Sequence, residues 1–300
     1  GYFATFMGTS ASYDVIYRNG INLSSTSLRA VNLTTIEKRD SLEKPVHQLP
    51  LRLSYPSPTV ALLTIENFYV DKKEQKFYPF IDSVFADLKK KQIDNIVIDV
   101  RNNEGGEENW GGYLYSYLTD TAFRYYDKIL MTQKEKFSFK EYAWLPKFFG
   151  LMHLFMKEKN AQVYFTKQKY LHTQEPAKNA YKGNIYVLIN GMSFSTTTEF
   201  TSMLHNNKKA TFIGEETGGA YYGNNSGVFA IVTLPNTKLT VGIPLMAYYS
   251  NVSGYPYKDR GILPDHTIKN SVDDILHKRD AVMEYTLELI RSQKTANNTH

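Results

Sequence analysis

Cysteine is absent from the 300 residues of this chain. The chain therefore has no disulfide bond, no cysteine nucleophile and no thiolate ligand for a metal ion. Long apolar runs are also missing and the mean hydropathy is −0.40, so no membrane span is predicted. The seven histidines are scattered, without an H-x-H or H-E-x-x-H pattern, and we predict neither a metal site nor a cofactor.

Positive charge is not concentrated in any part of the chain. The formal net charge is +5, and there is no arginine-rich block. The one basic run, LKKKQ at residues 88–92, lies where a helix is predicted to end, and lysines there complement the helix dipole. We therefore do not expect nucleic acid as a partner.

Two further polar stretches have ordinary interpretations. The glycine-rich segment 213–227 lacks the G-K-[ST] of a phosphate-binding loop, and we interpret it as a rim over a groove. Glu104, Glu107 and Glu108 have no histidine partners in the sequence, and we expect a solvated acidic turn.

The order of predicted elements indicates an α/β protein. Residues 12–35 have the pattern of a hairpin around Asn19-Gly20, and the charged, proline-containing segment 36–57 is interpreted as a linker. Beyond it, strands and helices alternate, which predicts a sheet with helices on both faces. The predicted strands cover 59–68, 94–101, 184–190, 210–216, 227–235 and 237–249, and the predicted helices cover 74–91, 109–119, 195–206 and 278–292.

Two details of this reading can be checked against the structure. In the helix at 74–91, one face carries five apolar side chains, which should be buried: Phe77, Ile81, Val84, Phe85 and Leu88. An aromatic, lysine-rich insertion spans about 125–180, and within it AWLPKFFGLMHLFMK (143–157) is interpreted as a buried or lid helix.

The first stretch that could carry chemistry is VIDVRNNEGG, residues 97–106. A buried strand ends here in a polar turn, where α/β sheets often place ligand sites. Gly105 and Gly106 allow backbone N–H groups to converge on one point, as in an oxyanion hole. An ordinary strand-to-helix turn is the alternative.

The second stretch is LINGMSFSTTTEF, residues 188–200. Ser195 lies where a strand is predicted to turn into a helix, so the N–H groups that follow it point toward its side chain. This is the arrangement of a nucleophile elbow, although the pattern is not G-x-S-x-G. The alternative is that Ser193 or Ser195 is a plain N-cap.

Taken in order, VIDVRNNEGG, VLINGMSFSTTTEF, ATFIGEETGG and DRGILPDHTI resemble the tail-specific, or C-terminal processing, serine peptidases. The similarity covers residues 59–290 and is greatest to the tricorn-core-like branch of Bacteroidetes-type secreted and lipoprotein members. It implies a crotonase-like α/β/β spiral over 58–293, with 1–57 as the remnant of a PDZ-like region plus a linker, and 294–300 as a loose tail. It also implies an extracytoplasmic location.

The resemblance assigns roles to individual residues. Ser195 falls on the nucleophile, and the N–H groups of Thr196 and of Gly105 or Gly106 fall on the oxyanion donors. The lysine of the Ser-Lys branch is replaced by Ala220.

The partners that handle the proton depart from the family pattern. The tricorn-like histidine would lie upstream of Gly1, and because the chain starts without a Met or a leader we expect a truncated or processed form. The acid that orients it is replaced by Lys258, with Asp259 beside it, and the helix glutamate is shifted to Glu199. His266 is a further candidate for the base.

The leading hypothesis is therefore a serine endopeptidase acting on peptide or unfolded protein, incomplete without an upstream base. The alternative is a non-catalytic module of the same fold that binds peptide or a hydrophobic ligand.

Overall fold

The computed structural model describes residues 8–42, 48–132 and 137–297. The chain divides into two compact units, residues 1–48 and 49–300. Each unit is described by itself.

The first unit contains a hairpin and a short helix. Strands β1 (Ser12–Asn19) and β2 (Asn22–Arg29) pair antiparallel, as the sequence predicts. The second strand ends earlier than expected, because helix α2 (Leu33–Leu42) follows. Asn32 Oδ1 accepts the Thr35 N–H at 2.9 Å, the bond of an N-cap, so residues 36–42 are helical and the linker interpretation is wrong there.

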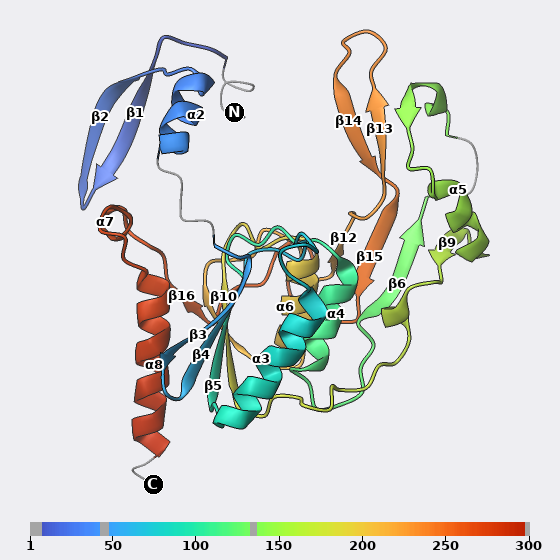
Figure 1. Ribbon diagram of the computed structural model, residues 1–300. Helices are drawn as coiled ribbons and strands as arrows, with labels where there is room; N and C mark the ends of the chain where they lie inside the picture. The colour runs from blue at the N-terminus through green and yellow to red at the C-terminus, as the bar shows by residue number, and fades with distance from the viewer. Residues whose placement is uncertain (1–7, 43–47, 133–136, 298–300) are drawn as a thin grey trace. The chain divides into compact units, whose positions relative to one another are not determined.

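The second unit is built on a six-stranded sheet with the order β16-β11-β10-β5-β4-β3 (Figure 1). Strands β3 and β4 are antiparallel, and the other neighbours are parallel. Residues 51–57, expected in the linker, are therefore a strand of this sheet. The strands are β3 (Leu51–Ser57), β4 (Val60–Ile65), β5 (Asn95–Asp99), β10 (Asn184–Ile189), β11 (Thr211–Gly214) and β16 (His266–Thr267).

Helices cover both faces of the sheet, which confirms the predicted mixed α/β arrangement. Alternate residues of β5 point to opposite sides: Ile96 and Ile98 join one core cluster and Val97 joins the other. The first cluster includes side chains of α3 (Phe77–Lys91), α4 (Glu108–Ser116) and α6 (Thr196–Asn206). The second includes Val282 and Ile290 of α8 (Ala281–Asn297), which lies across the sheet from the other three helices (Figure 1).

The structure confirms the predicted apolar face of α3. All five predicted apolar residues are buried, and each is at most 2% exposed. The helix ends at Lys91, and Gln92 closes it in the left-handed conformation. Lysines occupy its last turn, as the basic run in the sequence suggested.

The insertion and the following hairpins form two smaller antiparallel sheets. The first has the order β12-β15-β6-β9-β8 and the second the order β14-β13-β7. Their strands are β6 (Tyr126–Met131), β7 (Ala143–Trp144), β8 (Met156–Lys159), β9 (Gln162–Phe165), β12 (Gly223–Asn224), β13 (Phe229–Thr233), β14 (Thr240–Pro244) and β15 (Met246–Ser250).

The prediction of one helix over 143–157 is wrong. This segment divides into β7, the short helix α5 (Phe149–Met152), a 3₁₀ turn η2 (His153–Phe155) and β8. Pro146 and Gly150 weaken a continuous helix. The remaining elements are the 3₁₀ helices η1 (Lys140–Tyr142) and η3 (Lys169–Leu171) and the helix α7 (Val272–Leu276).

Candidate active site

Ser195 is the residue between the turn after β10 and the first residue of α6. Its backbone has φ 53° and ψ −127°, a strained combination for a residue with a side chain. Its hydroxyl makes no capping hydrogen bond to the helix. Strain and a hydroxyl that does not cap the helix are both typical of a functional serine at a strand-to-helix turn.

Ser193 has the structural role that was the alternative for this pair of serines. It is fully buried, its Oγ donates to the Val100 carbonyl at 2.9 Å, and it accepts the Asn190 N–H at 3.2 Å. These bonds join the turn after β10 to the end of β5. Ser193 therefore holds the turn that presents Ser195.

Ser195 lines a cleft of about 640 Å³. The segment 218–226 forms one wall of this cleft, which agrees with its interpretation as a rim. Ala220 lies in that wall, so no lysine is present at the family position. The lining residues are Glu104, Met192, Phe194, Ser195, Thr198, Gly218, Gly219, Ala220, Gly223, Asn224, Asn225 and Ser226.

The 102–106 turn packs directly against Ser195. A Cβ on Gly105 would lie 2.7 Å from Ser195 Cβ and 3.0 Å from the Thr196 nitrogen, and a Cβ on Gly106 would lie 2.3 Å from the backbone of Phe68. Both glycines have positive φ, 102° and 145°. Only glycine fits at these positions, and it allows the turn to approach the start of α6.

The two glycines differ in their hydrogen bonds. The Gly105 N–H donates to Asn103 Oδ1 at 2.9 Å, whereas the Gly106 carbonyl accepts from Thr196 Oγ1 at 2.9 Å. Within residues 8–42, 48–132 and 137–297, the N–H groups of Gly106 and Thr196 have no acceptor. These two N–H groups are free for a ligand atom.

A chain of hydrogen bonds runs from Ser195 into the core. Ser195 Oγ lies 3.2 Å from Ser226 Oγ, and Ser226 Oγ in turn donates to Asn224 Oδ1. Asn224 Nδ2 donates to Glu199 Oε1 at 2.6 Å, and Tyr126 OH donates to Glu199 Oε2 at 2.6 Å. The serine hydroxyl is thus connected to a carboxylate that is 3% exposed.

Burial raises the pKa of Glu199 to about 7, and the charge of Glu108 acts in the same direction. The hydrogen bonds from Tyr126 and Asn224 oppose the rise. Glu108 is itself half-buried, and burial raises its pKa while a hydrogen bond from Gln168 at 3.2 Å lowers it. The expectation of a fully solvated acidic turn is therefore wrong for Glu108.

The other candidate residues are not brought to Ser195. His266 is in β16, at the edge of the sheet, and its Nδ1 lies 2.9 Å from Tyr285 OH of α8. Asp259 is exposed, and neither residue lines the cleft. His205, at the far end of α6, packs against Tyr221 and Tyr255, and burial lowers its pKa.

Sequence reasoning missed Asn224 and Ser226, which the structure brings to the serine. Both lie in the segment interpreted only as a rim. The sequence offered no signal for them, because Ser226 is 31 positions from Ser195 and the segment has no periodicity.

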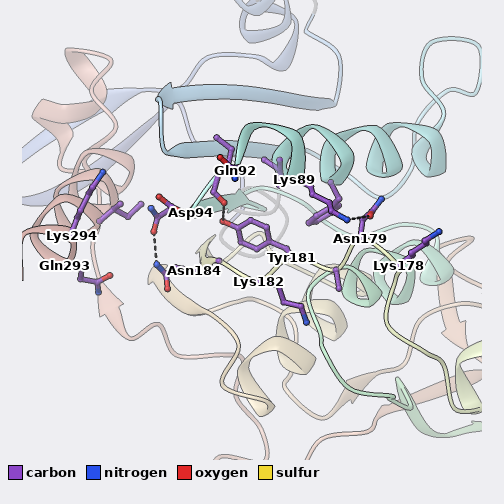
Figure 2. A pocket seen from close by; sticks show the side chains of 17 residues that line it. Lys89, Gln92, Asp94, Lys178, Asn179, Tyr181, Lys182, Asn184, Gln293 and Lys294 are labelled. Carbon is purple, nitrogen blue, oxygen red and sulfur yellow. Dashed lines mark hydrogen bonds between the residues drawn. The ribbon is translucent and has the colours of Figure 1, made fainter. Parts of the chain in front are cut away.

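A larger cavity, of about 1,020 Å³, lies at the opposite ends of the strands (Figure 2). It is bordered by Asn95 and Asn184, the first residues of β5 and β10, and contains a single carboxylate, Asp94, among its lining residues. Tyr181 OH donates to the Ile93 carbonyl at 3.1 Å, and this bond is drawn in Figure 2. In the described part of the chain no serine, threonine or histidine lines this cavity, so the smaller cleft at Ser195 is the candidate active site.

Two features are absent from the described residues. No helix in these parts of the chain is long and apolar enough to cross a membrane. Among the same residues, no three histidine, aspartate or glutamate side chains are grouped closely enough to hold a metal ion.

A strained serine at the start of a helix, next to two free N–H groups, is an arrangement typical of serine hydrolases. Residues 59–268 match Peptidase family S41, so the chain belongs to this family. This confirms the family that the sequence motifs indicated.

The chain is similar to several solved structures at low identity. One, of mature CPAF complexed with lactacystin, has a TM-score of 0.55 and 15% identity over 97% of this chain and 69% of its own. The photosystem II D1 C-terminal processing protease gives a TM-score of 0.47 and 16% identity over 86% of this chain and 55% of its own. A lipoprotein from Streptococcus agalactiae gives a TM-score of 0.46 and 16% identity over 85% of this chain and 73% of its own. No curated protein matches the chain.

Proposed function

We propose that this protein is a serine endopeptidase of the tail-specific type and that Ser195 is its nucleophile. The observation that carries the proposal is the position of Ser195, which is strained, uncapped and open to a cleft beside two free N–H groups. Membership of Peptidase family S41 supports the same activity.

In the proposed reaction Ser195 Oγ attacks a peptide carbonyl carbon, and the carbonyl oxygen becomes an oxyanion. The N–H groups of Gly106 and Thr196 hydrogen-bond this oxyanion. The N–H of Gly105 is already bonded to Asn103 Oδ1, which favours Gly106 over Gly105 for this role. Collapse of the tetrahedral intermediate releases the amine and leaves an acyl group on Ser195.

The base that takes the proton is proposed to come from residues upstream of Gly1. Ser195 Oγ has one hydrogen-bond partner in the described part of the chain, and that partner is another hydroxyl, Ser226. Among the residues that the structure describes, neither a lysine nor a histidine lines the cleft. A serine without a base is a poor nucleophile, so residues 1–300 alone should cleave slowly.

The substrate is proposed to be a peptide or an unfolded protein bound in extended form, as peptides commonly bind beside sheets. Nucleic acid is not proposed as a partner because the lysines are dispersed. We further propose that the core is a crotonase-like spiral and that residues 1–57 contain the remnant of a PDZ-like region. The motif resemblance also implies that the protein acts outside the cytoplasm. Fractionation of the native host tests the location.

One observation favours the alternative, a non-catalytic module that binds peptide or a hydrophobic ligand. The position of the family lysine is occupied by Ala220, and the cleft beside it is preserved. A protein that had lost catalysis would keep such a cleft as a binding site.

A fluorophosphonate probe separates the two functions. We expect Ser195 to be the modified residue in mass spectra, with faster modification in a chain extended upstream along its natural sequence. Ser195→Ala should abolish modification and cleavage of unfolded casein, while Ser193→Ala should retain modification at Ser195. Modification that persists in Ser195→Ala would refute the nucleophile. Rapid Ser195-dependent cleavage by residues 1–300 alone would refute the upstream base.

A further inference from the structure

The hydrogen bonds around Glu199 determine which group in each pair is the donor and which is the acceptor. An ionised carboxylate only accepts hydrogen bonds, so Tyr126 must donate to Oε2 and Asn224 must donate through Nδ2 to Oε1. This fixes the carboxamide of Asn224 with Oδ1 toward Ser226. Asn224 Oδ1 then accepts both the Ser226 N–H, at 3.0 Å, and the Ser226 hydroxyl.

The donor and acceptor roles can be assigned in the same way up to Ser195. A serine hydroxyl has one hydrogen, and Ser226 uses it toward Asn224. Across the 3.2 Å contact, Ser226 Oγ can therefore act only as an acceptor, and Ser195 must be the donor. The hydroxyl hydrogen of Ser195 is held on the side of Ser226, and its lone pairs are left free.

We propose that Glu199, Asn224 and Ser226 form a relay that sets the direction of the Ser195 hydroxyl, and that protonation of Glu199 at Oε1, the oxygen bonded to Asn224, reverses this direction. Ser226 touches the reacting oxygen, whereas Asn224 and Glu199 are positioning residues. The catalytic meaning of the relay rests on the proposed function of Ser195, but the relay itself can be measured without turnover.

Protonation of Glu199 on Oε1 breaks this order. The new hydrogen then faces Asn224 Nδ2, which already presents a hydrogen, whereas a proton on Oε2 would be accepted by the Tyr126 hydroxyl after rotation and would leave Asn224 in place. If Asn224 turns over, Nδ2 faces Ser226, and the Ser226 hydroxyl reverses and donates to Ser195. The Ser195 hydrogen then loses its acceptor in the relay.

The surroundings of Glu199 place this change near neutral pH. The titratable groups that face it are Glu108 of α4, Tyr125 and Tyr126 at the start of β6, and Tyr248 of β15. None of them is a cation that would stabilise the carboxylate. Burial and the charge of Glu108 keep the pKa of Glu199 at about 7.

Backbone resonances report the relay directly. In the 300-residue chain labelled with [¹⁵N]serine, the N–H signals of Ser195 and Ser226 should shift together as pH is varied, with a common midpoint at about 7. They are assigned by their loss in Ser195→Ala and Ser226→Ala. Glu199→Gln should leave both signals without this titration.

Ser226→Ala separates a relay from simple packing, because residue 226 keeps its N–H bond to Asn224 but loses the hydroxyl. With [¹⁵N]alanine, the residue 226 signal should still titrate, and the Ser195 signal should not. Ser226→Thr restores the hydroxyl and should restore the Ser195 titration. Two results would overturn the relay. One is a Ser195 signal that still shifts with pH in Ser226→Ala as it does in wild type. The other is a wild-type Ser195 signal that does not shift with pH while the Ser226 signal does.

Reactivity provides the second measurement. Loss of one neutral hydrogen bond should slow fluorophosphonate modification of Ser195 by about fivefold in Ser226→Ala above neutral pH, with most of the rate recovered in Ser226→Thr. Coupled titration without any modification of Ser195, even in the chain extended upstream, would refute the nucleophile and leave the relay standing. Modification with equal rates in wild type and Ser226→Ala, and no coupled titration, would refute the relay and leave the nucleophile standing.

Discussion

Glu199 should make the folded protein less stable as the pH rises through neutrality. Its pKa in the folded protein is about 7, whereas an ordinary glutamate has 4.5. Between these values the folded state keeps a proton that the unfolded state has released. The stabilisation from this proton is fully present below the unfolded pKa and is lost as pH rises through the folded pKa.

The magnitude follows from the size of the shift. Each pKa unit corresponds to about 1.4 kcal/mol, so Glu199 should lower the free energy of unfolding by roughly 2 to 3 kcal/mol between about pH 5 and about pH 8.5. No reduction for solvent screening applies, because the side chain is buried. Glu199→Gln removes the titrating group and should remove this contribution.

Urea denaturation of wild type and Glu199→Gln at stepped pH tests the prediction. The difference in unfolding free energy between wild type and Glu199→Gln should fall by the stated amount, with a nearly constant slope between about pH 5 and about pH 7 and little further change above that. Glu288→Gln makes the same chemical change at an exposed position of α8 and should give a flat difference. The reasoning would be refuted if the difference in unfolding free energy between wild type and Glu199→Gln did not change with pH. It would also be refuted if wild type gained stability relative to Glu199→Gln as the pH rises.

Two further predictions concern the backbone at the site. Gly106→Ala should lower the free energy of unfolding by about 3 kcal/mol or more, because the added Cβ would overlap the Phe68 backbone at a strained φ. Gly191→Ala, whose added Cβ would meet open space, should change the free energy of unfolding little. Thermal melts that match for the two variants would contradict this prediction. Ser195→Gly should raise the free energy of unfolding by about 1 kcal/mol, because glycine adopts a positive φ without strain. Ser193→Ala should lower the free energy of unfolding by roughly 1–3 kcal/mol, because the Asn190 N–H loses its acceptor. Denaturant midpoints that move in the opposite directions would show that the strain and the hydrogen bond have been misjudged.

Local pattern was sufficient for much of the central sheet and its helices. The apolar residues of α3 repeat with the helical period, and the near-continuous apolar run of β5 is typical of a strand covered on both faces. Both signals lie within one element and depend only on which side chains leave water. The order of the motifs was likewise enough to identify the family.

Prediction failed where the deciding contacts are distant or compete with local pattern. The run at 143–157 is apolar enough for a helix, but Pro146 and the pairing of β7 with β13 divide it. Residues 51–57 contain a proline and lie in a stretch with charges, yet they become a strand because β4 offers them an antiparallel edge. His266 was a candidate base until the structure paired it with Tyr285.

The candidate site divides in the same way. The sequence by itself determined that Ser195 follows a buried strand and precedes a helix, and that glycines occupy positions 105 and 106. Only the tertiary structure decided that Ser193 is buried as a support, that Gly105 has its N–H already bonded, and that Ser195 meets Ser226. Glu199 is a buried acid bonded to Tyr126 of β6 and Asn224 of β12, and a hydrogen bond between residues 25 positions apart leaves no periodic trace in a sequence.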